Sequence, residues 1–425
     1  MDTLKWFNNK FINQSFTYLV FGALTRGIPF FLLPILTRYL DTSAYGLIAM
    51  FMTFVSAVSI FLGVGGIEAV GVYFFRMERG QFKLFFGNVL VIWFFSSLGI
   101  LIFIYLFNEP LSLLLNIQGR WLFAGVILAS AQFVILLSLS LWQCEQNARA
   151  FGIYQVFQMV LDICLSLILV IHFGMGWEGR VTGIITAALF FLCGSFFILV
   201  GRGFIKWEFK PDYIKNSLNL GVPLIPYKFS SWAMLSLVPF FITHIKGLPS
   251  TGLYWVTYQI GYIVLIFASE IMRAYFPQVF ERLKDSTDED KRQIVRLTYI
   301  CFAAILAVAV MLGFISYHFL HIFLGPDFID AASLVAWLAL GQALSGMQSL
   351  LGQFLLYGKK TSWLSIIMSV AVLIHACLCY FLIKVSGVLG ATQATAVSYF
   401  ILFVVTWALT TKIYKLPWIT FFKTT

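Results

Sequence analysis

Long hydrophobic segments alternate with short polar loops along the whole chain. A helix of about 20 apolar residues crosses the roughly 30 Å hydrocarbon core of a bilayer. The first six predicted spans are 15–37, 45–75, 84–107, 121–143, 152–173 and 181–201, and the second six are 218–243, 252–276, 294–317, 331–357, 362–383 and 389–411. The pattern predicts an all-α polytopic membrane protein with about 12 transmembrane helices.

The composition and the distribution of charge agree with this prediction. The chain has 425 residues, of which 60% are hydrophobic and 11% charged, whereas about 25% of the residues of a soluble domain are charged. Of the 28 Lys and Arg residues, three fall in or beside predicted spans, 20 lie in the loops of one side, and five lie in the loops of the other: Arg38, Arg120, Arg180, Lys246 and Lys384. Basic loops stay in the cytoplasm, so both termini are expected there. The net charge of +10 is therefore explained by topology, not by nucleic-acid binding.

The chain is expected to consist of two halves of equal span number. The loop GRGFIKWEFKPDYIKNS, residues 201–217, is long, basic and nearly central. It separates two predicted six-helix lobes, residues 1–205 and 206–425. Because each half has six spans, both halves have the same orientation, and an axis along the membrane normal is expected to relate them.

Ionisable residues at membrane depth repeat between the halves. Arg26 and Lys228 are 202 positions apart, and so are Glu68 and Glu270. Each of the two glutamates is followed five residues later by Tyr-Phe. Several transporter folds are built from such repeats. The repeated positions therefore favour a transporter with equivalent charged groups in both lobes.

Two interpretations of these charges stay open. In the first, Arg26 with Glu68 and Lys228 with Glu270 are ion pairs that join adjacent helices. In the second, the cations line a central cavity and bind an anionic substrate, while the carboxylates position them or exchange protons. Either arrangement keeps the charges away from lipid, where each would cost at least about 2.5 kcal/mol. The run PLIPYK, which ends at Lys228, contains two prolines. They interrupt backbone hydrogen bonding and favour a discontinuous helix of the kind that forms transport sites.

Three further polar residues are candidates for the site. Arg273 is either a cation that binds substrate or an interfacial anchor. Asp162 in the fifth span is a candidate proton-relay carboxyl or a hydrogen-bond partner for a neighbouring helix. His375, 213 positions later in the eleventh span, is a candidate titrating group or a donor in helix packing.

Four glycines around Glu68, in GVGGIEAVG, permit close helix approach or local bending.

The sequence does not favour catalysis. It has no Gly-rich phosphate loop, no HExxH motif and no nucleophile with a plausible base. Its six cysteines lie apart in apolar stretches without the spacing of metal ligands. We therefore expect neither an enzyme nor a cofactor or metal.

Three motifs resemble a known family. The run PILTRYLDTSAYGLIAMF, residues 34–51, is similar to the first loop and second helix of the oligosaccharide flippases, especially the O-antigen (Wzx-type) members. Its counterpart in the second half is GVPLIPYKFSSWAML, residues 221–235, followed by STGLYWVTYQIG, residues 250–261. A third match to the family is GVLGATQATA, residues 387–396, which opens the twelfth predicted span. One departure is that Leu237-Val238-Pro239-Phe240 stands where the family often has an Asp-Arg pair, which puts any role of that pair in doubt here.

The resemblance implies the fold of the multidrug and toxin extrusion (MATE) transporters. It also implies alternating access to a central cavity, through which a polyprenyl-diphosphate-linked oligosaccharide moves across the bacterial inner membrane. The buried cations give an independent reason to expect this cargo, because an anionic lipid diphosphate needs a polar, cationic cavity to cross the bilayer. Possible partners are H⁺ or Na⁺, a polysaccharide polymerase and chain-length machinery. The alternatives are an ion-coupled exporter of small drugs and a lipid II flippase of the same fold; a membrane-embedded glycosyltransferase would need larger outer loops.

Overall fold

The chain is helical throughout the part that the structure describes. The computed structural model describes residues 21–22, 27, 30, 32–206, 208–284, 287–357, 361–414 and 416–418, and these contain helices and no β-strand. Within these residues, nine helices are long and apolar enough to cross a membrane. The prediction of an all-α polytopic membrane protein is confirmed.

The nine helices are compatible with twelve spans. The last helix, α14 (Thr361–Ile413), contains two predicted spans joined at Gly387, whose backbone has φ 60° and ψ −135°. The helix α10 (Ile225–Lys246) has 22 residues and contains most of the seventh predicted span, although its hydropathy leaves it outside the nine. Most of the first predicted span, 15–37, lies outside the described residues.

Contacts between residues divide the chain into two compact units. Unit 1 comprises Met1–Leu40 and Leu47–Trp232, and unit 2 comprises Asp41–Gly46 and Ala233–Thr425. Two helices therefore contribute to both units: α2 (Thr42–Phe61) begins in unit 2, and α10 begins in unit 1. The predicted lobes, residues 1–205 and 206–425, stay a prediction.

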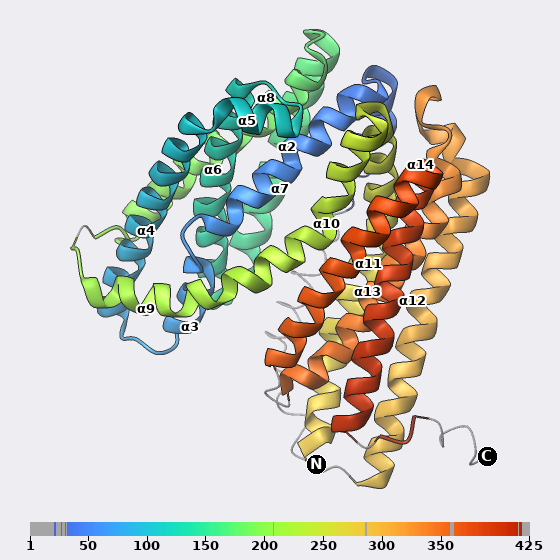
Figure 1. The fold of residues 1–425 in the computed structure, drawn as a ribbon. Coiled ribbons are helices and arrows are strands. Elements are labelled where there is room, and N and C mark those ends of the chain that lie inside the picture. Colours follow the sequence, from blue (N-terminus) through green and yellow to red (C-terminus); the bar gives the residue numbers. More distant parts are fainter. Residues whose placement is uncertain are drawn as a thin grey trace. The chain divides into compact units, whose positions relative to one another are not determined.

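Unit 1 is built from the helices shown in blue to green in Figure 1. They are α3 (Gly66–Tyr73), α4 (Arg79–Leu106), α5 (Asn108–Leu115), α6 (Gly119–Cys144), α7 (Ala148–Leu167) with the π-helical turn η2 (Ile168–His172), α8 (Gly176–Gly201), and α9 (Pro211–Gly221) with the turn η3 (Val222–Leu224). The helix α6 packs against α3, α4 and α8, and α7 packs against α8.

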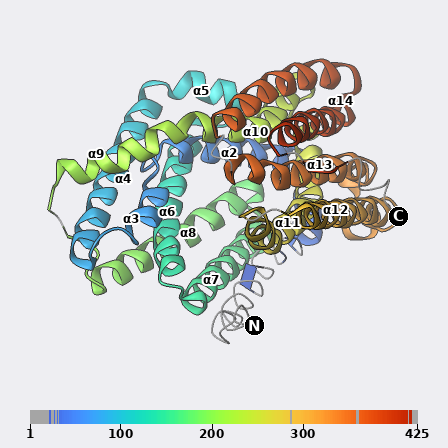
Figure 2. The ribbon, with the colours of Figure 1, turned by 90° about the horizontal axis from the view of Figure 1, so that it is seen from below.

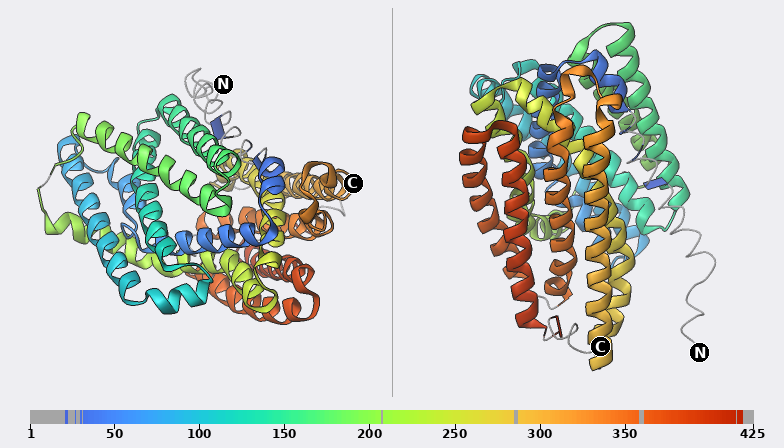
Figure 3. Two further views of the ribbon diagram at one scale, coloured as in Figure 1. Left: turned by 90° about the horizontal axis from the view of Figure 1, so that it is seen from above. Right: turned by 90° about the vertical axis from the view of Figure 1, so that its right-hand side faces the viewer.

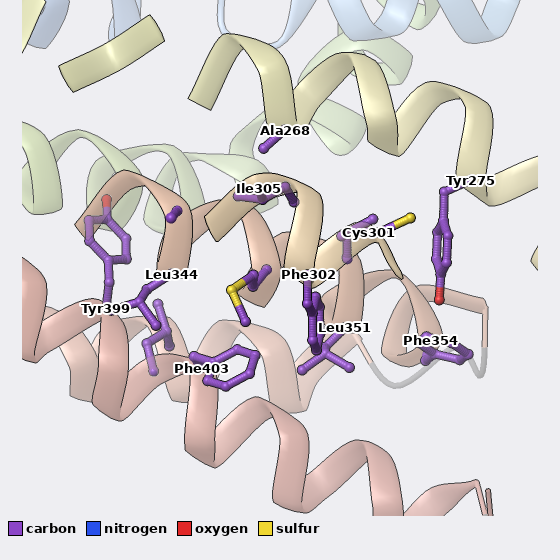
Figure 4. Close-up of a cluster of buried hydrophobic side chains, with 14 of the residues drawn as sticks. Ala268, Tyr275, Cys301, Phe302, Ile305, Leu344, Leu351, Phe354, Tyr399 and Phe403 are labelled. Atoms are coloured by element: carbon purple, nitrogen blue, oxygen red, sulfur yellow. The ribbon is translucent and has the colours of Figure 1, made fainter. Parts of the chain in front are cut away.

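Unit 2 contains the long helices coloured yellow to red. Besides α14 they are α11 (Leu248–Lys284), α12 (Asp288–Phe323) and α13 (Ala331–Tyr357), with the short turn η4 (Pro326–Phe328). The helices α11, α12 and α13 lie side by side (Figure 2), and in a side view the helices of this unit run next to one another along most of their length (Figure 3). A hydrophobic cluster joins all four, and Tyr275 and Tyr399 lie toward its opposite ends (Figure 4).

The second predicted span, 45–75, is interrupted. The helix α2 ends at Phe61, and α3 starts at Gly66. Between them, Gly63, Val64 and Gly65 all have positive φ, at 59°, 33° and 72°. A β-branched residue such as Val64 rarely adopts this conformation, so its strained backbone must be held by its surroundings. The glycines around Glu68 therefore produce a helix break, which the span prediction did not contain.

The seventh predicted span, 218–243, is also divided. The helix α9 ends at Gly221, and three residues of 3₁₀-helix lead into α10. A Cβ atom on Gly221 would lie 1.9 Å from the carbonyl oxygen of Val64, and one on Gly65 would lie 2.2 Å from Gly221 Cα. The two helix breaks of unit 1 thus cross backbone to backbone, which only glycine permits.

A buried asparagine fixes the chain that enters α9. Asn88 of α4 is 1% exposed. Its amide nitrogen donates to the carbonyl oxygen of Glu208 at 2.9 Å, and its amide oxygen accepts from the backbone nitrogen of Lys210 at 2.9 Å. Because both bonds go to backbone atoms, Asn88 sets the path of the polypeptide before α9 and therefore the position of the crossing.

We predict that Gly65→Ala lowers the stability of unit 1 by about 2–4 kcal/mol, because a methyl group there adds a clash to an unfavourable positive φ. Gly71→Ala is the matched control from the same segment, since a Cβ atom at Gly71 meets nothing within 4 Å. This change is expected to be neutral or slightly stabilising. Thermal unfolding of the purified variants in detergent measures both effects, and equal behaviour of the two variants would contradict the proposed crossing.

Candidate functional site

An ion pair lies next to the crossing of the two helix breaks. Lys228 Nζ, one turn into α10, lies 2.7 Å from Glu68 Oε1 of α3. The side chain of Lys228 is 31% exposed and that of Glu68 is 39% exposed. The pair is therefore open to a ligand or to water, whereas a charge facing lipid would be costly.

The carboxylate of this pair is only half satisfied. Glu68 Oε2 is buried and has no hydrogen-bond partner in the part of the chain that the structure describes. An ionised oxygen without a partner is unfavourable in such a place. The arrangement therefore holds Lys228 with a single charged contact and leaves Glu68 Oε2 able to accept a hydrogen bond from a further donor, such as a hydroxyl group.

Aromatic side chains flank the pair on α10. Trp232 donates its indole N–H to the carbonyl oxygen of Thr53 at 3.2 Å and to Ser56 Oγ at 3.1 Å. Its ring centroid lies 5.4 Å from that of Phe229, which is 49% exposed. The first two turns of α10 thus place the rings of Phe229 and Trp232 beside Lys228, and the hydrogen bonds of Trp232 to α2 hold this segment in unit 1.

The pairs differ from those that the sequence suggested. Lys228 pairs with Glu68 and not with Glu270, because the first turns of α10 belong to unit 1. Glu270 instead pairs within α11, where its Oε2 lies 3.2 Å from Nη1 of Arg273. Arg26 lies outside the described residues, so its predicted proximity to Glu68 stays a prediction.

The second pair lies in unit 2. The Arg273 side chain is 59% exposed, and that of Glu270 is 27% exposed. The two residues are three positions apart on the same helix, and such exposed pairs contribute only about 0.3–0.5 kcal/mol to stability. Arg273 is therefore weakly held, and its guanidinium group is accessible from the surface of unit 2.

His375 lies buried between α10 and the two halves of α14. This residue of α14 is fully buried, and its Nδ1 lies 2.9 Å from Ser398 Oγ in the second half of α14. It also hydrogen-bonds the backbone of Met234 in α10, and Cys379 Sγ lies 3.5 Å from its Nε2. These neutral partners join α10 to both halves of α14. The geometry therefore favours a role for His375 in packing.

Asp162 has a charged partner that the sequence analysis placed in an outer loop. Arg180 lies in the second turn of α8, and its Nη1 is 2.6 Å from Asp162 Oδ1. The same nitrogen donates to Ser166 Oγ, and this hydroxyl lies 3.1 Å from Asp162 Oδ1. The side chains of Arg180 and Asp162 are 16% and 24% exposed. Asp162 and Arg180 lie on the two helices that the short turn joins. Their opposite charges were the signal in the sequence that could have identified the pair.

Groups of three or more potential ligands are absent from the described residues, so no metal site is indicated there. The cysteines are free.

We predict that Arg180→Gln lowers stability by about 1–2 kcal/mol, because it leaves the carboxylate of Asp162 without its partner. Asp162→Asn combined with Arg180→Gln is expected to lose less than the sum of the two single changes. Arg120→Gln is the control: Arg120 forms a 2.6 Å pair with Glu178 but is 63% exposed, so its loss changes stability by less than about 0.5 kcal/mol. Thermal unfolding of all four variants tests this, and strict additivity would contradict a structural pair.

Comparisons with known proteins agree with the architecture. A membrane protein of Haemophilus influenzae of uncharacterised function is 25% identical over 365 residues, which cover 83% of this chain and 86% of the relative. The inward-facing structure of a multidrug resistance MATE family transporter of the MOP superfamily has a TM-score of 0.70 at 15% identity, with 97% of this chain and 96% of that chain covered. The lipid II flippase MurJ in an inward closed conformation has a TM-score of 0.72 at 15% identity, with 94% and 87% covered.

These two structures show that the fold is that of the MATE transporters and of MurJ. The model of the family described as polysaccharide biosynthesis protein matches residues 12–284, which is more than half of the chain. The chain therefore belongs to the polysaccharide biosynthesis protein family.

Proposed function

We propose that the protein is a flippase that moves a polyprenyl-diphosphate-linked oligosaccharide across the bacterial cytoplasmic membrane. The cargo would be an O-antigen (Wzx-type) repeat unit or a related one. The observation that carries this proposal is the partly exposed ion pair of Lys228 and Glu68 at two crossing helix breaks, in a chain of the polysaccharide biosynthesis protein family.

The chemistry of the pair suits an anionic head group. A diphosphate carries more negative charge than a carboxylate and offers more acceptor oxygens, so it competes with Glu68 for the ammonium group of Lys228. Lysine binds phosphate as a point charge on a flexible stem, and therefore does not require one fixed geometry of the ligand. Arg26, at the equivalent position 202 residues earlier, is the proposed second cation, and Arg273 is a third.

Glu68 would act as the counter-ion in the empty state. It neutralises Lys228 at membrane depth until the head group arrives, and this avoids the cost of an isolated charge. Once displaced, its carboxylate can accept a proton, which provides a route for coupling to H⁺; Na⁺ is the alternative coupling ion. Glu270 would likewise act as the counter-ion of Arg273 in the empty state. The neighbours of Asp162 and His375 support structural roles for those two residues instead.

Alternating access would then expose the head group on the other side while the lipid tail stays in the bilayer. Breaks in transmembrane helices are typical of transport sites. In unit 1 these breaks lie at the strained residues before α3 and at Pro223 in the 3₁₀ turn before α10, with Pro226 in the first turn of α10, next to the proposed site. We place both termini in the cytoplasm and expect a polysaccharide polymerase and chain-length machinery as partners.

The charge of the site argues against an exporter of cationic drugs, which would bind better at acidic groups without a compensating Lys228. A lipid II flippase would use the same diphosphate chemistry. Only the glycan distinguishes that cargo from an O-antigen unit.

We predict that Lys228→Gln lowers surface polysaccharide at least about ten-fold, because a charge-assisted contact to the diphosphate is lost. Lys228→Arg is expected to keep part of the activity, since the charge remains. Lys384→Gln is the control, since Lys384 is exposed at another place in the chain. The measurement is polysaccharide display in cells that lack the native gene, normalised to the amount of protein in the membrane.

Lipid-linked precursor should accumulate in the cells that carry Lys228→Gln. Normal display from this variant at normal protein level would refute the role of Lys228. A defect of equal size in Lys384→Gln would show that the effect is not specific to the site.

A further inference from the structure

One face of α11 carries a row of polar and aromatic side chains. The members are Trp255, Tyr258, Tyr262, Ser269, Glu270 and Arg273. Most successive members are three, four or seven residues apart, which returns to about the same side of an α-helix that turns by about 100° per residue. Ser269 and Glu270 are adjacent and lie at the two edges of this face. We call this face the α11 stripe.

The three rings of the stripe are arranged in sequence. The centroids of Trp255 and Tyr258 are 5.6 Å apart with an interplanar angle of 22°, and those of Tyr258 and Tyr262 are 5.8 Å apart at 38°. At these separations the rings are offset instead of fully face to face. Tyr262 is 40% exposed, whereas Trp255 and Tyr258 are half-buried. Each ring therefore leaves part of its surface uncovered.

The packing of α11 in unit 2 uses its other face. A Cβ atom on Gly261 would lie 3.1 Å from Leu338 of α13, and Ala268 packs against Gly346 of the same helix. Ala268 points toward the hydrophobic cluster in Figure 4. At about 100° per residue, Gly261 and Ala268 lie about 100–140° around α11 from Tyr262 and Arg273. Tyr258, at the edge of the stripe, also packs against a buried cluster that includes Leu338 of α13, whereas Trp255 and Tyr262 are not among the residues of that contact.

The stripe also differs from a lipid-facing surface. The helix α12 of the same unit has the composition expected there, since its large exposed side chains include Val310, Met311, Phe314 and Ile315. The α11 stripe instead carries hydroxyl groups and the ion pair of Glu270 and Arg273. Groups of this kind at membrane depth face protein or water. The composition of the stripe therefore suits contact with water or a polar ligand better than contact with lipid.

We propose that the α11 stripe is a stacking platform for sugar rings, with Trp255, Tyr258 and Tyr262 as the contact surface. This inference rests on the proposed function and assigns the glycan of the cargo to a place in unit 2. A pyranose ring has a face rich in C–H groups, which carry partial positive charge, and aromatic faces carry the complementary negative charge. Offset rings along a helix tolerate different sugars, because they recognise the ring face and not one pattern of hydroxyl groups.

The test uses the full chain with its native cargo in cells. Tyr262→Leu and Trp255→Leu remove one ring each and are expected to lower surface polysaccharide about five-fold, with lipid-linked precursor accumulating. Tyr262→Phe keeps the ring and is expected to retain near-normal display. Phe314→Leu removes an exposed aromatic ring from α12 of the same unit and is expected to have no effect.

A second measurement separates this inference from the proposed function. Binding of farnesyl diphosphate, which has no sugar, to purified protein in detergent is expected to fall in Lys228→Gln and to stay unchanged in Tyr262→Leu. Normal display by both leucine variants would overturn the sugar platform, and so would an equal loss in Tyr262→Phe or a loss of farnesyl diphosphate binding in Tyr262→Leu. If the lysine variant binds farnesyl diphosphate normally while the leucine variants still reduce display, the charge model fails and the platform stands.

Discussion

The charge compensation between Lys228 and Glu68 is the interaction on which the rest of the account depends. An ammonium group at membrane depth is unfavourable unless an anion or water accompanies it. A fully buried and fully hydrogen-bonded pair would be a purely structural contact between two helices. This pair is partly exposed, has one charged contact of 2.7 Å, and leaves the second carboxylate oxygen without a partner among the described residues. In the proposed mechanism, this arrangement stabilises the empty state and allows another anion to take the place of Glu68.

The backbone around the pair follows from the same requirement. Two interrupted helices bring Glu68 and Lys228 together, and both breaks depend on small residues: Gly65 and Gly221 meet at a distance that excludes any side chain. Asn88 fixes the polypeptide that leads into this crossing through two bonds to backbone atoms. Packing in unit 1 therefore supports the strained conformation of Val64, and the strain lies one turn from the carboxylate.

The sequence contained much of this information. Hydropathy predicted the spans, because a bilayer imposes a minimum length on apolar helices, and the 202-residue repeat identified Glu68 and Lys228 as special. The pairing could not be predicted, since it depends on the first turns of α10 packing with unit 1 although they follow the central loop. The partner of Asp162 was missed because Arg180 lies close to a span boundary, where hydropathy cannot decide between loop and helix. The aromatic stripe of α11 was hidden among many aromatic residues until the packing face of the helix was known.

The most direct test of the central claim is the affinity of the purified protein for farnesyl diphosphate, measured for the native chain and for Glu68→Gln. If Glu68 competes with the head group for Lys228, neutralising the glutamate removes the competitor and raises the affinity about three- to ten-fold, even though an ion pair is lost. An affinity that is unchanged, or that falls as it does in Lys228→Gln, would contradict the account, because Glu68 would then be no competitor for the cation.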